Sequence, residues 1–222
     1  MIRILIVDDH AIVRRGLVQI VTADDDFTVV GEAANAEEML AFVRRERCDV
    51  VVTDISMPGR SGLDALKELK QEFPHLPVLV LSVHPEDQYG VRALKLGAAG
   101  YLTKETAPEE LVAAIRKAAA GGKYITPSLA ERLAFDLDNG CPVHETLSTR
   151  EYQVLCMLAS GKSVMTIAEE LGLSLKTINT YRVRILQKMG MKKTAELVHY
   201  AISNWLVGPA NQPVRHEWPY HA

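Results

Sequence analysis

The chain has 222 residues, 48% of them hydrophobic, and a formal net charge of −3, which allows one large domain or two of ordinary size. It has no run of 18 apolar residues and no basic stretch followed by an apolar one at its start. We therefore expect no membrane-spanning helix, no secretory signal and a cytoplasmic location. Its three cysteines lie far apart without Cys-x-x-Cys or Cys/His spacing, so we expect neither a disulfide framework nor a zinc site.

Charge is distributed unevenly between the two halves of the chain. Residues 1–120 contain 14 Lys/Arg against 19 Asp/Glu, a net charge of −5. Residues 147–207 contain 8 Lys/Arg against 4 Asp/Glu, a net charge of +4. This difference indicates two domains with different partners, and a basic segment is compatible with a nucleic acid.

The first half alternates short apolar runs with amphipathic segments. Apolar runs of this length are typical of parallel strands that are buried on both faces. Strands are predicted at 2–7, 28–33, 50–53, 78–82 and 100–103, and helices at 11–22, 36–46, 63–72, 87–96 and 108–120. A capping box at 106–109, with Pro108 in the first turn, predicts the start of the fifth helix. Five such repeats within 1–121 predict an α/β domain with a five-stranded, doubly wound parallel sheet.

The second half is predicted to be a small all-α domain. Residues 122–146 mix turn-forming residues with one amphipathic segment near 127–137, so we expect a linker that contains a short helix. A capping box at 148–151 begins the first helix of a domain over 147–207. Its further helices are predicted at 164–171, 175–189 and 194–206. The Pro-rich, polar residues 208–222 have no periodicity, and we expect them to be disordered.

Chemically reactive side chains stand where four of the predicted strands end. Asp8 and Asp9 follow the first strand, Asp54 the third, Ser82 ends the fourth and Lys104 follows the fifth. The carboxyl ends of parallel strands face one crevice, so these side chains are expected to converge there. Any one of these acidic residues alone would more often cap a helix, but the set together favours a functional site.

The acidic residues of this set suit a divalent cation that prefers oxygen ligands. We expect Mg²⁺ at Asp8, Asp9 and Asp54, with the backbone carbonyl of Ser56 as a further ligand. A bound cation would relieve the repulsion between carboxylates and keep Asp54 ionised. An ionised carboxylate is a competent nucleophile toward phosphorus, and Lys104 could then hold a phosphoryl oxygen.

With these residues in place, residues 1–120 resemble the receiver domain of bacterial response regulators, which has a flavodoxin-like fold. The resemblance implies that Asp54 is the phosphoacceptor, Asp8 and Asp9 the metal pair, Ser82 the switch hydroxyl and Lys104 the phosphate-binding lysine. It makes Tyr101 the switch aromatic, whose ring is expected to swing inward as Ser82 moves. It also suggests that Ser56 and His84 influence the lifetime of the phosphoryl group, whereas His10 is expected to be an exposed histidine.

A second motif lies in SVMTIAEELGLSLKTINTYRVRILQKM (163–189). Ala168 allows two helices to cross closely, Gly172 fits a left-handed turn and Ser174 can cap the next helix. This pattern is typical of a helix-turn-helix, whose second helix enters the major groove. An exposed helix with ordinary surface charges is the alternative. We expect Asn179, Thr180 and Val183 to face bases, and Lys176, Thr177, Arg182, Arg184 and Lys188 to face the DNA backbone.

Residues 147–206 resemble the LuxR-type DNA-binding domain, through LSTREYQVL, SVMTIAEELGLSLKTI and ILQKMG. A receiver followed by this domain is the arrangement of the NarL/FixJ family of response regulators. NTYRVR is similar to the branch of that family that includes the regulators GacA and BvgA. Many relatives carry a lysine at the position of Asn179 and often a basic residue at that of Val183. The preferred DNA sequence therefore cannot be taken from them.

Taken together, the two domains predict a DNA-binding response regulator. The resemblance implies that a sensor histidine kinase phosphorylates Asp54 and that the protein binds double-stranded DNA as a homodimer, with RNA polymerase as a further partner. We expect no enzyme activity beyond Mg²⁺-dependent phosphorylation and dephosphorylation of Asp54 itself. Two alternatives stay open, a phosphatase that uses Asp54 and a DNA-binding regulator whose receiver does not signal.

Overall fold

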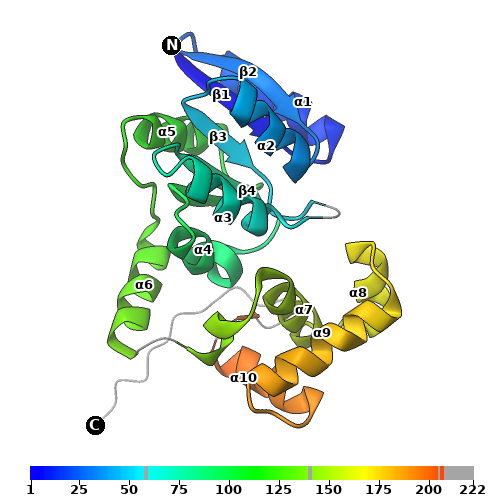
Figure 1. Cartoon of the computed structure of the whole chain (residues 1–222). Helices are drawn as coiled ribbons and strands as arrows, with labels where there is room; N and C mark the ends of the chain where they lie inside the picture. The colour runs from blue at the N-terminus through cyan, green and yellow to red at the C-terminus, as the bar shows by residue number, and fades with distance from the viewer. Residues whose placement is uncertain (58–59, 140–141, 205, 208–222) are drawn as a thin grey trace, which may run out of the picture.

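The computed structural model describes residues 1–57, 60–139, 142–204 and 206–207. An α/β domain forms the first half of the chain and a helical domain the second, as Figure 1 shows. The predicted fold class is therefore confirmed. Within the described residues, no helix is long and apolar enough to cross a lipid bilayer. The tail over 208–222, predicted to be disordered, lies outside the described residues.

The first domain is built on one parallel sheet. Its strands are β1 (Ile2–Val7), β2 (Phe27–Ala33), β3 (Val50–Thr53), β4 (Val78–Ser82) and β5 (Gly100–Thr103). Their order in space is β2-β1-β3-β4-β5, the flavodoxin-like order. Because the order reverses between β1 and β3, the crevice for a ligand lies at the carboxyl ends of these two strands.

Helices cover both faces of the sheet. They are α1 (Ala11–Thr22), α2 (Ala36–Arg45), α3 (Gly62–Glu72), α4 (Glu86–Lys95) and α5 (Pro108–Ala119). Alternate strand residues point to opposite faces, so Ile4 and Ile6 pack with α1 and α5, whereas Leu5 and Val7 pack with α2, α3 and α4. The central strands β3 and β4 are buried along their whole length and are almost entirely apolar, whereas the edge strand β2 is largely half-buried.

The start of α5 corrects one detail of the sequence analysis. The helix begins at Pro108, as expected, but the capping box predicted over 106–109 is absent. Ala107 is the N-cap residue and makes no side-chain cap bond, while the Thr106 hydroxyl lies 3.3 Å from that of Thr103. The N-cap is one residue later than predicted, so Thr106 and Glu109 do not hold the positions that a capping box requires.

The second half contains α6 (Pro127–Asn139), the 3₁₀ turn η1 (Val143–Thr146), α7 (Thr149–Ala159), α8 (Val164–Leu171), α9 (Leu175–Lys188) and α10 (Thr194–Ser203). The predicted capping box between Ser148 and Glu151 is confirmed, with both of its hydrogen bonds present. Leu155, Ile178 and Leu197 are fully buried, so α7, α9 and α10 share one core. No sequence pattern predicted η1.

Candidate phosphoacceptor site and DNA-binding helix

The pairing of β1 with β3 brings the acidic residues together. Val7 is the register partner of Thr53, so Asp8 and Asp54 are the next residues on two adjacent strands. The Asp54 N–H donates to the carbonyl of Val7 at 2.9 Å, which fixes this end of the pair. Asp8 and Asp54 are 1% and 2% exposed, an arrangement that is costly for two carboxylates without a cation.

Lys104 supplies a positive charge between these carboxylates. Its Nζ lies 2.5 Å from Asp8 Oδ2 and 2.6 Å from Asp54 Oδ2, and its side chain is only 12% exposed. The Lys104 N–H donates to the Ser82 carbonyl at 2.8 Å, which ties the end of β5 to the end of β4. Burial alone would lower the pKa of Lys104, but the bonds to Asp54 and Asp8 outweigh it and raise this pKa. Lys104 is therefore an ammonium ion at neutral pH.

The donor atoms around Asp9 fit a hard divalent cation. Asp8, Asp9 and His10 offer ligand atoms that all lie within 4.8 Å of one another. Asp9 Oδ1 is buried and accepts no hydrogen bond with good geometry among the described residues. The neighbouring His10 ring, which is 66% exposed, has its Nδ1 at 2.8 Å from this oxygen. The Asp8 and Asp9 carboxylates therefore fit Mg²⁺, which prefers oxygen ligands.

Asp54 and Ser56 lie beside this acidic group rather than in it. Asp54 does not belong to the set of ligand atoms within 4.8 Å and contacts Lys104 instead. The Ser56 N–H donates to Asp54 Oδ1 at 2.9 Å, and the Ser56 hydroxyl is buried without a hydrogen bond to the described residues. A ligand role for Asp54 and for the Ser56 carbonyl stays a prediction.

Ser82 and Tyr101 are both fully buried beside the crevice. The His84 N–H donates to Ser82 Oγ at 3.2 Å, and the Tyr101 hydroxyl donates to the His84 carbonyl at 2.9 Å. The Tyr101 ring thus already points inward, and burial raises its pKa. Burial also lowers the pKa of His84, against the charge of Asp54, which raises it.

Two residues that the sequence analysis did not assign to the site also shape it. A Cβ atom on Gly62 would lie 2.3 Å from the Asp54 carbonyl oxygen. Only glycine therefore fits at this position, where the start of α3 approaches the backbone of Asp54. Arg14 Nη1 donates to the Asp8 carbonyl at 2.7 Å. In the sequence, Gly62 is only a residue typical of a turn. Nothing in the local pattern of α1 distinguished Arg14 from an ordinary exposed arginine.

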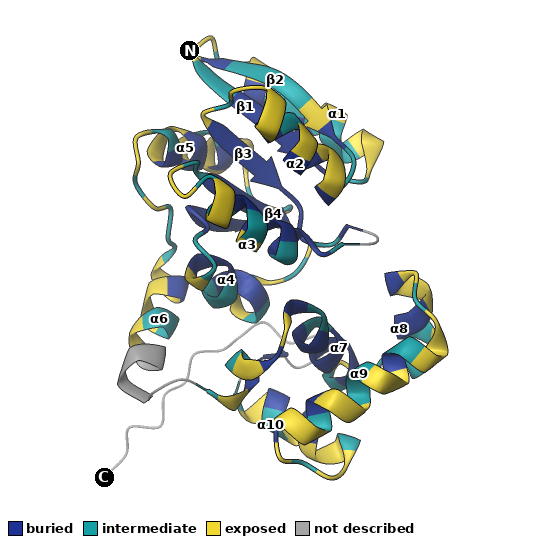
Figure 2. Ribbon diagram, in the orientation of Figure 1, coloured by how far each residue is buried: buried dark blue, intermediate teal, exposed yellow. Residues whose placement is uncertain are grey.

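The helix-turn-helix has the local geometry that the sequence indicates. Gly172 ends α8 with φ +63°, in the left-handed region, and Ser174 caps α9 by accepting from the Thr177 N–H. The residues expected to face bases, Asn179, Thr180 and Val183, are all exposed. Figure 2 shows the exposed side of α9 and the largely buried α7 beside it. A surface hollow on α9 is lined by Lys176, Asn179, Thr180, Val183, Arg184 and Gln187.

The residues that we expect to contact the DNA backbone differ in their exposure and in the side chains that they contact. Lys176 and Arg184 are exposed, whereas Thr177 and Arg182 are half-buried. Lys188 Nζ lies 2.6 Å from Oε2 of Glu151, whose carboxylate is buried, so Lys188 ties α9 to α7. Contact with the DNA backbone stays a prediction for all of these residues, and for Lys188 it competes with this ion pair.

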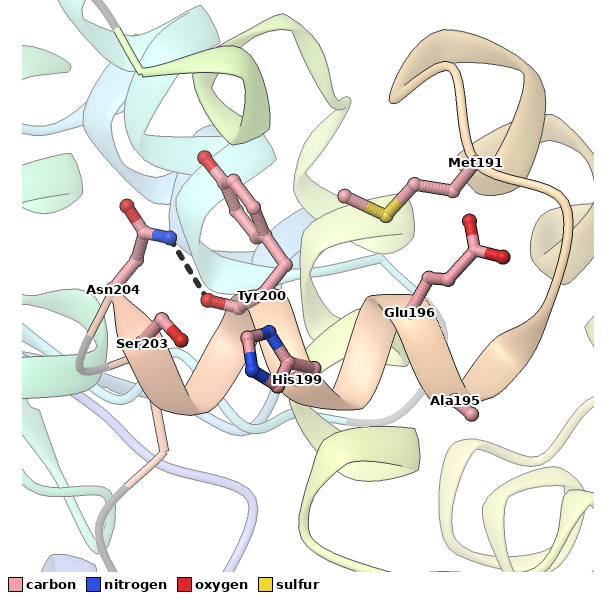
Figure 3. A pocket seen from close by; sticks show the side chains of 7 residues that line it. All are labelled: Met191, Ala195, Glu196, His199, Tyr200, Ser203 and Asn204. Carbon is pink, nitrogen blue, oxygen red and sulfur yellow. Dashed lines mark hydrogen bonds between the residues drawn. The ribbon is translucent and has the colours of Figure 1, made fainter.

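A second hollow lies on α10 and the loop before it (Figure 3). Its lining residues are Met191, Ala195, Glu196, His199, Tyr200, Ser203 and Asn204. Leu197 and Ala201 face the domain core, while Ile202 on the same helix is 57% exposed. Trp205, which follows α10, lies outside the described residues.

Comparison with known proteins matches both halves of the chain. Residues 4–116 match the response regulator receiver domain, and residues 145–201 match the luxR family of bacterial regulatory proteins. The chain is 39% identical to the response regulator GacA of Pseudomonas aeruginosa, over 95% of this chain and 100% of GacA. It is 37% identical to the response regulator UvrY of Escherichia coli K12, over 93% of this chain and 96% of UvrY.

Among solved structures, one similar chain is RcsB of Salmonella enterica serovar Typhimurium bound to the promoter rprA in the presence of phosphomimetic BeF3−. The identity is 29% and the TM-score 0.58, over 90% of this chain and 97% of RcsB. The similarity therefore extends across both domains and the linker between them.

Proposed function

The chain belongs to the two-component response regulators of the NarL/FixJ family, and we propose that phosphorylation of Asp54 by a sensor histidine kinase controls its binding to promoter DNA. Receiver domains generally bind Mg²⁺ at an acidic pocket, and LuxR-type domains bind DNA. The one observation that carries the proposal is the position of Lys104, whose ammonium contacts both Asp8 and Asp54 at the buried end of the sheet.

The chemistry of the transfer follows from the groups at Asp54. One carboxylate oxygen of Asp54 attacks the phosphorus of a phosphohistidine, the new O–P bond forms and the P–N bond breaks. The histidine nitrogen leaves with the electron pair and takes up a proton from solvent. Mg²⁺ held by Asp8 and Asp9 would supply positive charge to the phosphoryl oxygens. Lys104 then leaves Asp54 Oδ2 to pair with a phosphoryl oxygen, and Ser82 can donate its hydroxyl to another.

On the DNA side, we propose that α9 enters the major groove of a promoter. Asn179 has an amide that can pair with adenine, and Lys176 and Arg184 offer charges to the phosphate backbone. RcsB, a relative of similar length, is bound to a promoter in the presence of a phosphomimetic group, which supports promoter binding by the phosphorylated form of this chain. We further propose a homodimer on DNA, contact with RNA polymerase and no enzyme activity other than self-phosphorylation and its reversal.

The experiment that tests the proposal is phosphorylation of the full chain with acetyl phosphate and Mg²⁺, followed by intact-mass measurement. Wild type is expected to gain the mass of one phosphoryl group. Asp54→Asn is expected to gain none, whereas the matched control Asp25→Asn, at an exposed position before β2, behaves as wild type. Omission of Mg²⁺ is expected to prevent the gain. A phosphoryl group on the Asp54→Asn protein would refute the assignment of the acceptor.

A further inference from the structure

Arg14 lies in the first turn of α1 and reaches back to the end of β1. Its Nη1 donates to the Asp8 carbonyl at 2.7 Å, and its Nε lies 3.4 Å from Oε2 of Glu32 on β2. Side chains of an α-helix tilt toward its N-terminus, which explains how a residue six positions after Asp8 can reach it. Figure 1 shows α1 beside β1 and β2. Arg14 therefore joins all three elements at the edge of the acidic crevice.

The Arg14 guanidinium is largely enclosed by the protein. The Arg14 side chain is 18% exposed, whereas that of Glu32 is 48% exposed. A charged group with so little exposure needs hydrogen-bond partners to offset its lost hydration. The contact with Glu32 is long and lies in solvent, where an ion pair contributes little. The Asp8 carbonyl is therefore the main partner of this guanidinium.

The carbonyl that Arg14 holds belongs to the peptide bond between Asp8 and Asp9. The pairing of β1 with β2 ends at Val7 and Ala33, and the Asp8 N–H donates to the Ala33 carbonyl at 3.1 Å. The Asp8 carbonyl therefore lies beyond the last pair of the sheet, and Arg14 binds it from the helix. Because a peptide unit is planar, a bond that fixes its oxygen also fixes the direction in which Asp9 leaves it.

The side chain of Asp8 is bound by the protein, whereas that of Asp9 depends on its backbone. Asp8 Oδ1 accepts from the His10 N–H at 2.8 Å, and Oδ2 lies 2.5 Å from Lys104 Nζ. Asp9 Oδ1 is buried, yet it accepts no well-aligned hydrogen bond within the part of the chain that the structure describes. The placement of the Asp9 carboxylate therefore depends on the peptide that Arg14 holds.

We propose that Arg14 is a positioning residue for Mg²⁺, which holds the peptide between Asp8 and Asp9 so that the two carboxylates stay together. The inference rests on the proposed function, because it needs Mg²⁺ at these two residues. Without the guanidinium, the peptide can turn, and Asp9 Oδ1 then leaves the site. Groups that orient the ligands of a metal commonly affect its binding nearly as much as the ligands themselves.

Two other roles for Arg14 lead to different results. If its positive charge mainly repelled a nearby cation, removal of the charge would strengthen Mg²⁺ binding. If Arg14 only joined α1 to the sheet, its removal would lower the stability of the receiver and leave the Mg²⁺ dissociation constant unchanged. A positioning role predicts weaker Mg²⁺ binding. The direction of the change therefore distinguishes the three roles.

The test titrates the full chain with Mg²⁺ alone, without a phosphoryl donor, and follows the amide NMR shifts. In Arg14→Met, a side chain of similar length has neither charge nor donor. Its Mg²⁺ dissociation constant is expected to rise by about tenfold or more, the usual effect of losing a group that orients a metal ligand. Arg15→Met, at the exposed arginine next in the chain, is the matched control and is expected to keep the wild-type value.

An unchanged or lower dissociation constant in Arg14→Met would overturn the proposal. If Arg14→Met does not fold, Arg14→Gln replaces it with the same expected result, because glutamine is uncharged and too short to reach the Asp8 carbonyl.

A second measurement separates Mg²⁺ binding from the transfer step. Phosphorylation by acetyl phosphate is followed at increasing Mg²⁺ concentrations. In Arg14→Met, the half-saturating Mg²⁺ concentration is expected to rise by the same factor as the dissociation constant. The maximal rate is expected to stay that of wild type, because Arg14 acts on Asp8 and Asp9 and not on the acceptor Asp54. A lower maximal rate at an unchanged half-saturating concentration would contradict the positioning role.

The outcomes separate this inference from the proposed function. If wild type binds no Mg²⁺, the role of Arg14 and the metal site of the proposed function both fail. If wild type binds Mg²⁺ but takes no phosphoryl group, the proposed function fails, and the Mg²⁺ titration alone decides the role of Arg14. If wild type does both and Arg14→Met binds Mg²⁺ equally well, only the role of Arg14 is overturned.

Discussion

Gly62 determines how closely the start of α3 can pass the phosphoacceptor. The Gly62 N–H donates to the Ile55 carbonyl at 3.2 Å, in the segment that follows Asp54. A Cβ atom there would overlap the Asp54 backbone, which cannot move as a flexible side chain can. This close approach involves main-chain atoms of a loop, and so the residue pattern alone could not show it.

We predict that Gly62→Ala destabilises the receiver by about 1–3 kcal/mol, the usual cost of a steric overlap that forces a backbone shift. It is also expected to slow phosphorylation, because Asp54 must move. Urea unfolding and intact-mass kinetics measure the two effects. Gly16→Ala is the control, since nothing lies within 4 Å of its Cβ, and in a helix it should be neutral or stabilising by about 0.5–1 kcal/mol. Equal behaviour of the two variants would contradict the steric argument.

Glu151 holds the helical domain together in a way that depends on pH. Burial raises its pKa, but bonds from Lys188 and Ser148 outweigh burial and lower it below the ordinary value of 4.5. Since the folded pKa lies below the unfolded one, Glu151 stabilises the fold above the unfolded pKa. This contribution is lost as pH falls through the folded pKa.

The urea midpoint of wild type is therefore expected to fall more steeply than that of Glu151→Gln between about pH 6 and about pH 3. At neutral pH, Glu151→Gln is expected to be less stable by about 1–3 kcal/mol, because it weakens a charged hydrogen bond. Glu131→Gln, at an exposed position of α6, serves as the control and should follow wild type. Parallel curves for wild type and Glu151→Gln would rule out the role assigned to this ion pair.

At the residue scale, the sequence was sufficient to predict which side chains meet at the site when those side chains lie at the ends of strands. Asp8, Asp54 and Lys104 meet because parallel pairing aligns their strands, a geometry that follows from the order of the elements. The close approach of Gly62 to Asp54 and the bond from the Ser56 N–H to Asp54 could not be predicted, because these backbone contacts depend on the path of the loop.

The side chains of α9 that we expect to face bases are exposed. Two of them also make hydrogen bonds to backbone carbonyls of the same helix. The Asn179 amide donates to the Leu175 carbonyl at 3.1 Å, and the Thr180 hydroxyl donates to the Lys176 carbonyl at 2.9 Å. Both groups can exchange these bonds for base edges without loss of a helical backbone bond. Arg184, in contrast, is exposed and free to reach a phosphate.

Asn179→Ala is thus predicted to change base preference, with a loss of about 1–3 kcal/mol at its preferred base pair and little on random DNA. Arg184→Ala is predicted to weaken binding to all sequences and to reduce the salt slope by about one. Titrations on selected and random DNA at several salt concentrations measure both. A loss for Asn179→Ala that is the same on the two DNAs would remove its base-reading assignment.

Some element boundaries followed from the sequence where a specific cap residue marks them, whereas the last helix, predicted over 194–206, ends at Ser203. The Ser148–Glu151 capping box and the left-handed Gly172 were both predicted, since each needs a specific residue type. The 3₁₀ turn η1 was missed because four residues are too few to show a period. The N-cap of α5 was predicted one residue too early, because the Thr106 hydroxyl lies beside the Thr103 hydroxyl and does not cap the helix.

At the scale of the whole molecule, the two domains make one continuous apolar core across α4 and α7. The sequence predicted both domains and their order. It could not predict this docking, because Tyr89 and Tyr152, whose rings meet edge to face, look like core residues of their own helices and lie far apart in the chain. The linker helix α6 also packs on α4, where a Cβ atom on Gly90 would lie 3.0 Å from Leu129.

One measurement tests the central claim most directly. Genomic DNA fragments are selected with the phosphorylated protein, and the dissociation constant for them is then measured with and without acetyl phosphate and Mg²⁺, for wild type and for Asp54→Asn. We predict that the phosphoryl donor tightens binding by wild type and leaves binding by Asp54→Asn unchanged. An unchanged affinity in wild type, or an equal gain in Asp54→Asn, would contradict the control of α9 by the acidic crevice.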